Sequence, residues 1–248
     1  MLSVTPWCII RVRSCTGGMG NNGRGERGER PRVTIHYAQT LDGRIATRTG
    51  QSQWISGEAS LRLAHELRAA HQAVMVGVGT VLADDPRLTV RLVEGPSPRR
   101  IVVDSTLRLP LDARVLTDGA ADTIVATTPR APENRIMAVR CRGAEVVVVP
   151  ADAGGRVDLG QLLRRLAARG ITALLIEGGR ELITSALRAR LVDRLVVCIA
   201  PKVIGAGVEA VGDLHIGHMS EALTFARVRV TTVGEDVVFD GQLQPAPR

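Results

Sequence analysis

Five short polar or glycine-rich stretches of this chain hold side chains that could bind a ligand, and each adjoins an apolar run. They are residues 40–46 (TLDGRIA), 52–56 (SQWIS), 77–86 (GVGTVLADDP), 88–91 (LTVR) and 177–179 (EGG). Loops at the ends of buried strands are where α/β proteins keep ligands and catalytic groups. The pattern therefore predicts a ligand site assembled from several strand ends, which is more typical of an enzyme than of a binding scaffold.

Two of these stretches supply glycines where a strand gives way to a helix. Gly77, Gly79 and Thr80 would let backbone N–H groups and a hydroxyl approach a phosphate or a nicotinamide ring. Gly178 and Gly179 would expose the first N–H groups of the next helix, a ready site for a pyrophosphate. Both runs could also be tight turns that need glycine only for packing, so the glycines alone leave the two interpretations open.

The charged and aromatic side chains in these stretches suit a phosphorylated, hydroxyl-rich ligand. Aspartate readily bonds its own neighbouring backbone, so one of Asp84 and Asp85 is expected to cap the turn, leaving the other to bind hydroxyls. The planar guanidinium groups of Arg68 and Arg91 would match phosphate oxygens, although most arginines are simply solvated. Trp54 could stack on an aromatic ring of a ligand, or it could plug its loop.

The histidines have an ordinary explanation and, for one of them, a functional one. His36 lies inside the first apolar strand, where it could be a satisfied core histidine or could point into the cleft. His65 and His71 lie near the first predicted helix and are expected at the surface.

Most generic catalytic motifs are absent from the sequence. The run at 77–82 lacks the third glycine of G-x-G-x-x-G, and the sequence contains no G-x-x-x-x-G-K-[ST], no G-x-S-x-G and no H-E-x-x-H. The four cysteines show no C-x-x-C spacing. Neither a metal site nor a disulfide framework is therefore expected, and a reducing cytoplasm fits.

Composition narrows the class of partner. The 248 residues are 45% apolar but only 2% aromatic, with a formal net charge of +7. Because aromatic side chains are so few, the protein has no platform on which bases could stack. No nucleic-acid partner is therefore expected. No apolar run reaches the ~18 residues that a membrane span needs, so no membrane association is expected either. The mildly basic body suits an anionic cofactor or a phosphate ester.

Strand-like and helix-like runs alternate along the chain, and Ser56 is the expected N-cap of the first helix. Strands are predicted at 33–38, 73–78, 101–103, 123–126, 146–149, 171–176 and 195–200, helices at 58–70, 133–142, 159–169 and 181–190, and a closing hairpin at 228–233 and 236–240. Because the apolar strands are continuous, the pattern predicts an α/β fold with a mostly parallel sheet, helices on both faces and an antiparallel hairpin. Residues 1–31, rich in glycine and charge, are expected to be a disordered tail before a single domain at 32–248.

Taken together and in this order, the motifs resemble the reductase domain of riboflavin biosynthesis. This family is the C-terminal half of a bacterial bifunctional deaminase–reductase and a stand-alone enzyme in archaea and fungi. The resemblance covers about residues 32–241 and implies a dihydrofolate reductase-like, three-layer α/β/α fold, usually a cytoplasmic homodimer. It also implies an NADPH-dependent oxidoreductase that converts the ribosyl group of a ribosylaminopyrimidine 5′-phosphate to ribityl.

The resemblance assigns roles to individual residues. Substrate contacts are implied for Ser52, Arg68, Leu88, Arg91 and Glu177. Cofactor contacts are implied for Ala38, Trp54, Gly79, Thr80, Asp84, Ser105, Gly178, Gly179, Arg180, Glu181 and Leu182. Most of these residues would orient the ligands. Asp84 and Glu177 are the side chains expected to take part in catalysis, with His36 and water as other possible proton donors.

Three departures from the family pattern bear on the expected activity. The deaminase half is not present in this chain, and His36 stands where many relatives have lysine or asparagine. After Gly179, Arg180 and Glu181 replace the small or threonine-containing residues often found in the family. Arg180 could pair with a cofactor phosphate, whereas Glu181 would repel one unless it points away. The 52–55 loop (SQWI) favours the uracil substrate, 5-amino-6-(5-phosphoribosylamino)uracil, over 2,5-diamino-6-(5-phosphoribosylamino)pyrimidin-4-one. The alternatives are a reductase of the same fold for another pterin- or pyrimidine-like substrate, and a non-catalytic NADPH-binding protein.

Overall fold

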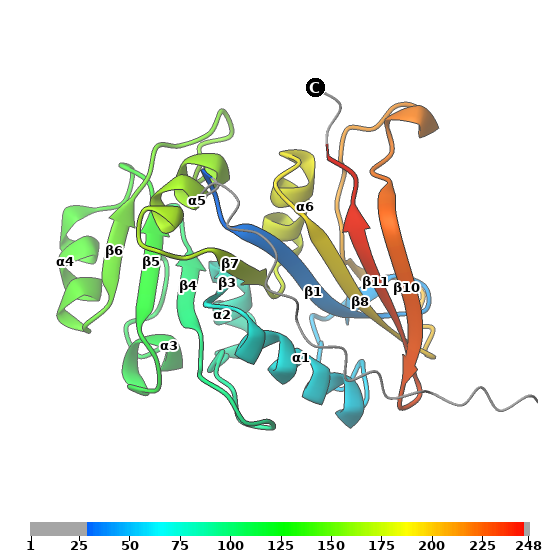
Figure 1. The fold of residues 1–248 in the computed structure, drawn as a ribbon. Helices are drawn as coiled ribbons and strands as arrows, with labels where there is room; N and C mark the ends of the chain where they lie inside the picture. Colours follow the sequence, from blue (N-terminus) through cyan, green and yellow to red (C-terminus); the bar gives the residue numbers. More distant parts are fainter. Residues whose placement is uncertain (1–28, 246–248) are drawn as a thin grey trace, which may run out of the picture.

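A mixed sheet of nine strands forms the centre of the structure, a computed structural model that describes residues 29–245 (Figure 1). Its strands are β1 Arg32–Thr40, β3 Ala73–Gly77, β4 Arg99–Val103, β5 Thr123–Thr127, β6 Glu145–Val148, β7 Ala173–Ile176, β8 Arg194–Ala200, β10 Phe225–Val233 and β11 Asp236–Leu243. They stand in the order β10-β11-β8-β1-β7-β3-β4-β5-β6. The predicted tail 1–31 lies outside the described residues except for its last three positions.

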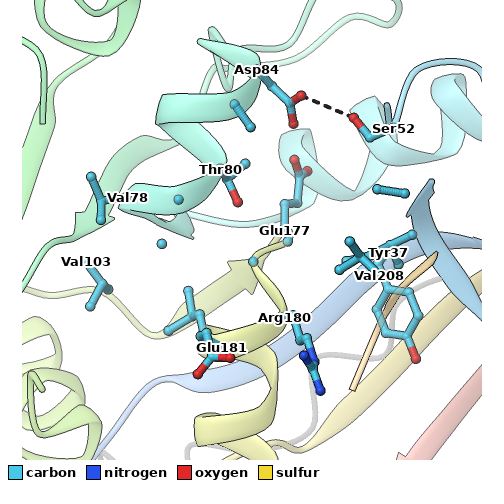
Figure 2. Close-up of a pocket in the computed structure, with 18 of the residues that line it drawn as sticks. Tyr37, Ser52, Val78, Thr80, Asp84, Val103, Glu177, Arg180, Glu181 and Val208 are labelled. Atoms are coloured by element: carbon cyan, nitrogen blue, oxygen red, sulfur yellow. Dashed lines mark hydrogen bonds between the residues drawn. The ribbon is translucent and has the colours of Figure 1, made fainter. Parts of the chain in front are cut away.

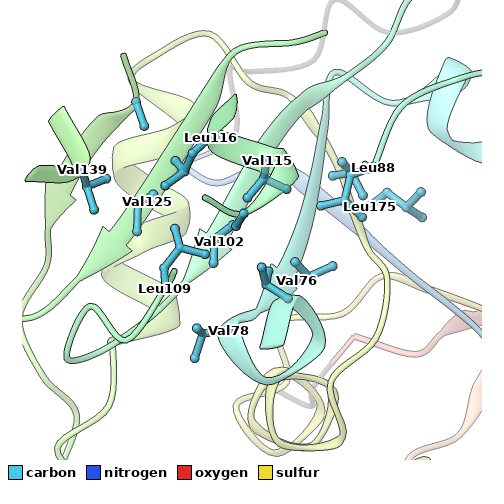
Figure 3. Close-up of a cluster of buried hydrophobic side chains, with 14 of the residues drawn as sticks. Val76, Val78, Leu88, Val102, Leu109, Val115, Leu116, Val125, Val139 and Leu175 are labelled. Atoms are coloured by element: carbon cyan, nitrogen blue, oxygen red, sulfur yellow. The ribbon is translucent and has the colours of Figure 1, made fainter. Parts of the chain in front are cut away.

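Helices cover both faces of this sheet, as Figure 1 shows for α1 on one side and α5 and α6 on the other. The helices are α1 Glu58–Ala70, α2 Val78–Asp84, α3 Arg114–Thr117, α4 Glu133–Cys141, α5 Leu159–Ala167 and α6 Arg180–Arg188, with a 3₁₀ turn, η1, at Met219–Glu221. Side chains of α1 to α4 pack into one hydrophobic cluster, part of which is drawn in Figure 3. Side chains of α5 and α6 pack into a second cluster on the opposite face.

The apolar runs form the strands that the sequence predicted. Strands β1 and β3 to β8 pair in parallel, while β11 pairs antiparallel with β8 and β10 antiparallel with β11. All five residues of β5 are buried, as expected for a parallel strand covered on both faces. The predicted fold, a three-layer α/β/α arrangement with a C-terminal antiparallel hairpin, is confirmed.

The helices that follow the two strands at the middle of the sheet lie on its opposite faces. β3 and β7 are direct neighbours. The helix that follows β3 is α2, which belongs to the first cluster, and the helix that follows β7 is α6, which belongs to the second. Such a change of direction opens a crevice at the carboxyl ends of the strands, where open α/β sheets bind ligands.

A small second sheet, which the sequence did not reveal, stands beside this crevice. Strand β2 (Arg44–Thr47) pairs antiparallel with β9 (Gly207–Glu209). Asp42 supports the pairing, because its Oδ2 accepts from the backbone N–H of Gly205 at 2.7 Å. Two strands of three or four residues, far apart in the sequence, leave no periodic signal that sequence reading can find.

The cap of α1 corrects another prediction. The N-cap is Gly57 rather than Ser56, and a glycine has no side chain that could accept a hydrogen bond from the helix. Instead Asp236, at the start of β11, supplies the acceptor: its Oδ2 accepts from Gly57 N–H at 2.9 Å and from Ser60 Oγ at 2.5 Å. Asp236 is 2% exposed, so the cap is a buried tertiary contact between the first helix and the last strand.

This arrangement predicts that Asp236→Ala lowers the free energy of unfolding by about 1–3 kcal/mol, because two donors lose their buried acceptor. Ser56→Ala, which removes the side chain expected from the sequence to cap the helix, should change it by less than about 0.5 kcal/mol. Urea denaturation of both variants measures the difference. A larger loss for Ser56→Ala than for Asp236→Ala would contradict the assignment.

Candidate functional site

A cavity of about 1090 Å³ lies at the carboxyl ends of β1, β3, β4 and β7, and Figure 2 shows part of its lining. It brings together most of the residues that the sequence predicted for the site. These are Ala38, Ser52, Trp54, Arg68, Gly79, Thr80, Asp84, Ser105, Glu177, Gly178, Gly179, Arg180, Glu181 and Leu182. Leu88 and Arg91 do not line the cavity. They belong to the segment after α2 that contacts Arg68 through Thr89.

A nearly buried ion pair occupies the floor of the cavity. The Arg68 guanidinium donates to both carboxylate oxygens of Glu177, with Nε–Oε1 at 2.8 Å and Nη2–Oε2 at 2.7 Å. The two side chains are only 14% and 10% exposed. Such a bidentate, charge-assisted pair fixes both groups in orientation. It joins α1 directly to the end of β7.

A second group of polar contacts extends from Arg68 to the segment after α2. Arg68 Nη1 donates to the carbonyl oxygen of Thr89 at 3.1 Å, and Arg91 Nη1 donates to Thr89 Oγ1 at 2.8 Å. Burial and the nearby guanidinium groups of Arg68 and Arg87 lower the pKa of Arg91. Leu88 is 2% exposed and has a φ of 55°, so its side chain packs in the core. This edge of the site concentrates positive charge that an anion would neutralise.

The glycine-rich half of the cavity lies between the first turns of α2 and α6. A Cβ built on Gly79 would meet nothing within 4 Å, so neighbouring atoms do not require glycine there. Gly178 and Gly179 have φ of 90° and 86°, a conformation that side chains strain. A Cβ on Gly179 would lie 3.3 Å from Thr80 Oγ1. The turn therefore holds the N-terminus of α6, where the first N–H groups have no partner within the helix, close to Thr80.

The two charged residues that open α6 each have a partner. Glu181 Oε2 accepts from Arg156 Nη1 at 2.7 Å, and Arg180 Nη2 lies 3.6 Å from Glu209 Oε2. In Figure 2 both side chains leave the helix at the cavity wall. Because Arg156 also lines the cavity, its charge offsets that of Glu181 near the helix N-terminus.

The sequence predicted that one of the two adjacent aspartates caps its own turn, but the side chain of Asp85 instead bonds a distant segment. Asp85 ends α2 with a φ of 39°, and its Oδ1 accepts from the backbone N–H of Arg114 at 2.8 Å. Asp84 lines the cavity, where its Oδ1 accepts from Ser52 Oγ at 3.2 Å (Figure 2). Trp54, 73% exposed, stands on the same loop as Ser52. Asp84 thus connects α2 to a loop that carries a free aromatic side chain.

His36 faces the cavity from β1 but is 7% exposed. Its Nε2 lies 3.6 Å from the Sγ of the buried Cys198. Burial is the main cause that lowers the pKa of His36, with an opposing effect of Glu177. The imidazole is therefore neutral at physiological pH.

Sequence reasoning missed Arg156 in the cavity wall, and next to Arg68 it missed Thr89 and misplaced His65. His65 was expected at the surface but is 3% exposed, and its Nδ1 accepts from the backbone N–H of Arg91 at 2.9 Å. Thr89 is 4% exposed and contacts both arginines. His65 lies one helical turn before Arg68, and that i, i+3 spacing was the available signal.

Two features are absent from the described part of the chain. No helix within residues 29–245 has the length and apolar character that crossing a bilayer requires. Nor does any group of three or more His, Cys, Asp or Glu in that range have an arrangement that could hold a metal ion.

Comparison with known sequences agrees with this geometry. The family model described as the RibD C-terminal domain matches residues 31–239. A Methanothermobacter thermautotrophicus protein named 2,5-diamino-6-ribosylamino-4(3H)-pyrimidinone 5′-phosphate reductase is 47% identical over 217 residues, covering 85% of this chain and 97% of the relative. The riboflavin biosynthesis protein RibD of Aquifex aeolicus is 41% identical over 211 residues, covering 85% of this chain but 57% of that relative.

Solved structures show the same architecture. Acinetobacter baumannii RibD superposes with a TM-score of 0.74 at 27% identity, over 87% of this chain and 59% of that one. The riboflavin biosynthesis reductase Rib7 of Saccharomyces cerevisiae gives a TM-score of 0.70 at 26% identity, over 90% of this chain and 95% of that one.

The buried His65 makes folding stability depend on pH. Burial, together with Arg68 and Arg91, lowers the pKa of His65 to about 4, against 6.5 for a free histidine. Between these values the unfolded chain binds a proton that the folded chain refuses, so the free energy of unfolding falls as the pH drops from 6.5 toward 4. The loss from this residue is up to about 3 kcal/mol.

His65→Asn has no titrating group at this position, so its stability should fall less than that of the unchanged protein over the same pH range. Urea denaturation at several pH values measures both slopes. Parallel curves for the two proteins would show that His65 does not titrate as described.

Proposed function

We propose, because this chain belongs to the RibD C-terminal domain family, that it is a reductase of riboflavin biosynthesis. In this proposal it uses NADPH to convert the ribosyl group of a ribosylaminopyrimidine 5′-phosphate to a ribityl chain. One observation carries the proposal: the paired Arg68 and Glu177 stand between a cluster of positive charge and a glycine-rich cavity wall. The phosphorylated substrate and the dinucleotide would then bind on either side of Glu177, with their reacting ends next to each other. Residues 32–248 form its single reductase domain in this proposal, and the cytoplasm is its location.

The positive edge of the site suits the phosphate of the substrate. Arg91 and Arg68 would offer guanidinium N–H groups to its oxygens, since Arg68 keeps only one side of its planar group on Glu177. Glu177 and Ser52 would bind sugar hydroxyls, a task for which ionised carboxylates are well suited. The buried Leu88 supports this edge through packing.

The glycine-rich wall suits a nicotinamide cofactor. The open space at Gly79 leaves room for a flat ring against the backbone, and Thr80 Oγ1 stands within reach of the same space. The N-terminus of α6 after Gly179 would hold the pyrophosphate, as helix N-termini do. Ala38, Trp54, Asp84, Ser105 and the opening residues of α6 (Arg180, Glu181 and Leu182) complete the wall. The cavity, at about 1090 Å³, is larger than the ~300–1,000 Å³ usual for one small ligand, which leaves room for two.

NADPH, when bound, supplies a hydride for C1′ of the opened ribosylamine. What the protein contributes is mainly orientation and exclusion of water. Both Glu177 oxygens accept hydrogen bonds from Arg68, so we assign Glu177 an orienting role as a carboxylate. The neutral, enclosed His36 is a poor acid at neutral pH. Asp84, which accepts a hydrogen bond from Ser52 at the cavity, is the side chain best placed to relay a proton from water.

The identity of the pyrimidine base has two candidates. The Ser52–Ile55 loop of the sequence favours the uracil substrate, whereas the relative with 47% identity is named for the diaminopyrimidinone. A reductase for another pterin- or pyrimidine-like compound would bind NADPH but turn over neither. A non-catalytic NADPH-binding protein would have no use for the Arg68–Glu177 pair, which the structure retains.

The last strand pair supports a homodimer. From Ala226 to Thr232 every residue of the edge strand β10 is exposed, including Val228 at 53% and Val230 at 61%. Val237 of β11 is a further exposed apolar residue, at 39%. Exposed apolar strands at a sheet edge mark interaction surfaces, and a second copy of the chain offers the same surface in return.

The decisive experiment follows NADPH oxidation with each pyrimidine separately. Turnover of one substrate establishes the reductase and identifies the base. Arg91→Ala should raise the KM for that substrate about 10- to 100-fold, as loss of a charged hydrogen bond costs about 1.5–3 kcal/mol, while NADPH affinity stays unchanged. Arg99→Ala, at the amino end of β4 and outside the cavity lining, is the matched control and should leave KM unchanged. Equal loss of both affinities in Arg91→Ala would refute the phosphate contact.

Val230→Glu should convert the dimer to a monomer, since it places a charge in the apolar contact between copies. Light scattering after gel filtration measures the mass of both proteins. Glu235→Gln, in the exposed turn between β10 and β11, is the control and should remain dimeric. A monomeric unchanged protein would refute the dimer directly.

A further inference from the structure

His65 is a buried imidazole placed between Arg68 and Arg91. The family resemblance assigns no role to His65 itself. It stands on α1 one turn before Arg68 and is 3% exposed. Its Nδ1 accepts from the backbone N–H of Arg91 at 2.9 Å, and its Nε2 lies 3.5 Å from Arg68 Nη1. The charged groups around it come from three elements: Arg68 on α1, Arg91 after α2 and Glu177 after β7.

These contacts determine which tautomer the ring adopts. A nitrogen that accepts a hydrogen bond carries no proton, so the neutral ring has its proton on Nε2. The Nε2–H and the Arg68 Nη1–H are then both donors, so the 3.5 Å contact between them is not a hydrogen bond. A second proton on the ring would place a cation between two guanidinium groups. The fold therefore holds His65 as a neutral acceptor aimed at one backbone N–H.

That N–H belongs to Arg91, whose side chain contributes to the positive edge of the site. The segment Thr89–Arg91 is held by α1 at two points, through Arg68 at the carbonyl of Thr89 and through His65 at the N–H of Arg91. Arg68 itself is fixed by Glu177. With both points anchored on a rigid helix, the Cα of Arg91 has a defined distance from the Arg68 guanidinium.

We propose that His65 is a positioning residue for the anion-binding pair Arg68 and Arg91, acting through the backbone of Arg91 and not through contact with the substrate. The inference rests on the proposed function, in which this pair binds the substrate phosphate. It goes further by naming the group that sets the spacing of the two arginines. A neutral acceptor is suited to this place because it adds no negative charge that would compete with the phosphate.

Two substitutions separate this role from simple packing. His65→Leu fills a similar volume but removes the acceptor, whereas His65→Asn places Oδ1 near the former Nδ1 and keeps it. We expect His65→Leu to raise the KM for the pyrimidine substrate about tenfold, with kcat and the Kd for NADPH within about twofold of the unchanged protein. His65→Asn should restore KM to within about threefold. Glu66→Gln, the exposed neighbour on α1, is the control for substitution of this helix.

Failure of the proposed function and failure of this inference give different results. If the unchanged protein reduces a pyrimidine and His65→Leu has the same KM, or if His65→Asn is as impaired as His65→Leu, the positioning role is wrong. If neither pyrimidine is reduced, the proposed substrate is wrong, and the Kd for ribose 5-phosphate tests the inference instead. That Kd should rise about tenfold in His65→Leu, and an unchanged value overturns the proposal.

A measurement on the unchanged protein covers the case in which His65→Leu does not fold. Nitrogen-15 NMR of the imidazole at neutral pH should show an unprotonated Nδ1 and a protonated Nε2. A ring protonated at Nδ1, or at both nitrogens, could not accept from Arg91 N–H and would overturn the proposal.

Discussion

The ion pair between Arg68 and Glu177 joins the helix on one face of the sheet to the end of its central strand. Both side chains are almost buried, and a buried charge is tolerated only when a partner and further hydrogen bonds compensate it. Its two members are 109 positions apart, so the pair forms only when α1 and β7 have reached their places. The neighbouring contacts to Thr89 extend from the same guanidinium, so the positive edge of the site depends on it too.

The order of the strands makes room for this pair and for what binds beside it. β7 enters the sheet between β1 and β3, and the helices that follow β3 and β7 leave toward opposite faces. The crevice between them has a glycine-rich wall at the N-terminus of α6 and an edge rich in arginine. The two walls differ in chemistry, and in the proposed function each would take a different anionic ligand.

Expectations drawn from the sequence held where one segment contains its own signal. The continuous apolar runs became the parallel strands, and the four helices with predicted bounds, α1, α4, α5 and α6, lie within two residues of those bounds, whereas the one-turn α3 was not predicted. They failed where a contact comes from a distant segment. The cap of α1 comes from Asp236 in the last strand and not from Ser56, and the pair β2–β9 has only three or four residues on each side. His65, expected at the surface, is buried because the 88–91 segment folds over it.

The family resemblance added most of the individual site residues, while residue type and local spacing were enough to define the α/β class and the loops at the carboxyl ends of the strands. They suffice because hydrophobic periodicity and glycine placement act over a few residues. The partners of those side chains were decided by the tertiary structure: Arg68 with Glu177, Glu181 with Arg156, and Asp84 with Ser52. Such pairings depend on distances between segments that are remote in sequence, which only the assembled sheet fixes.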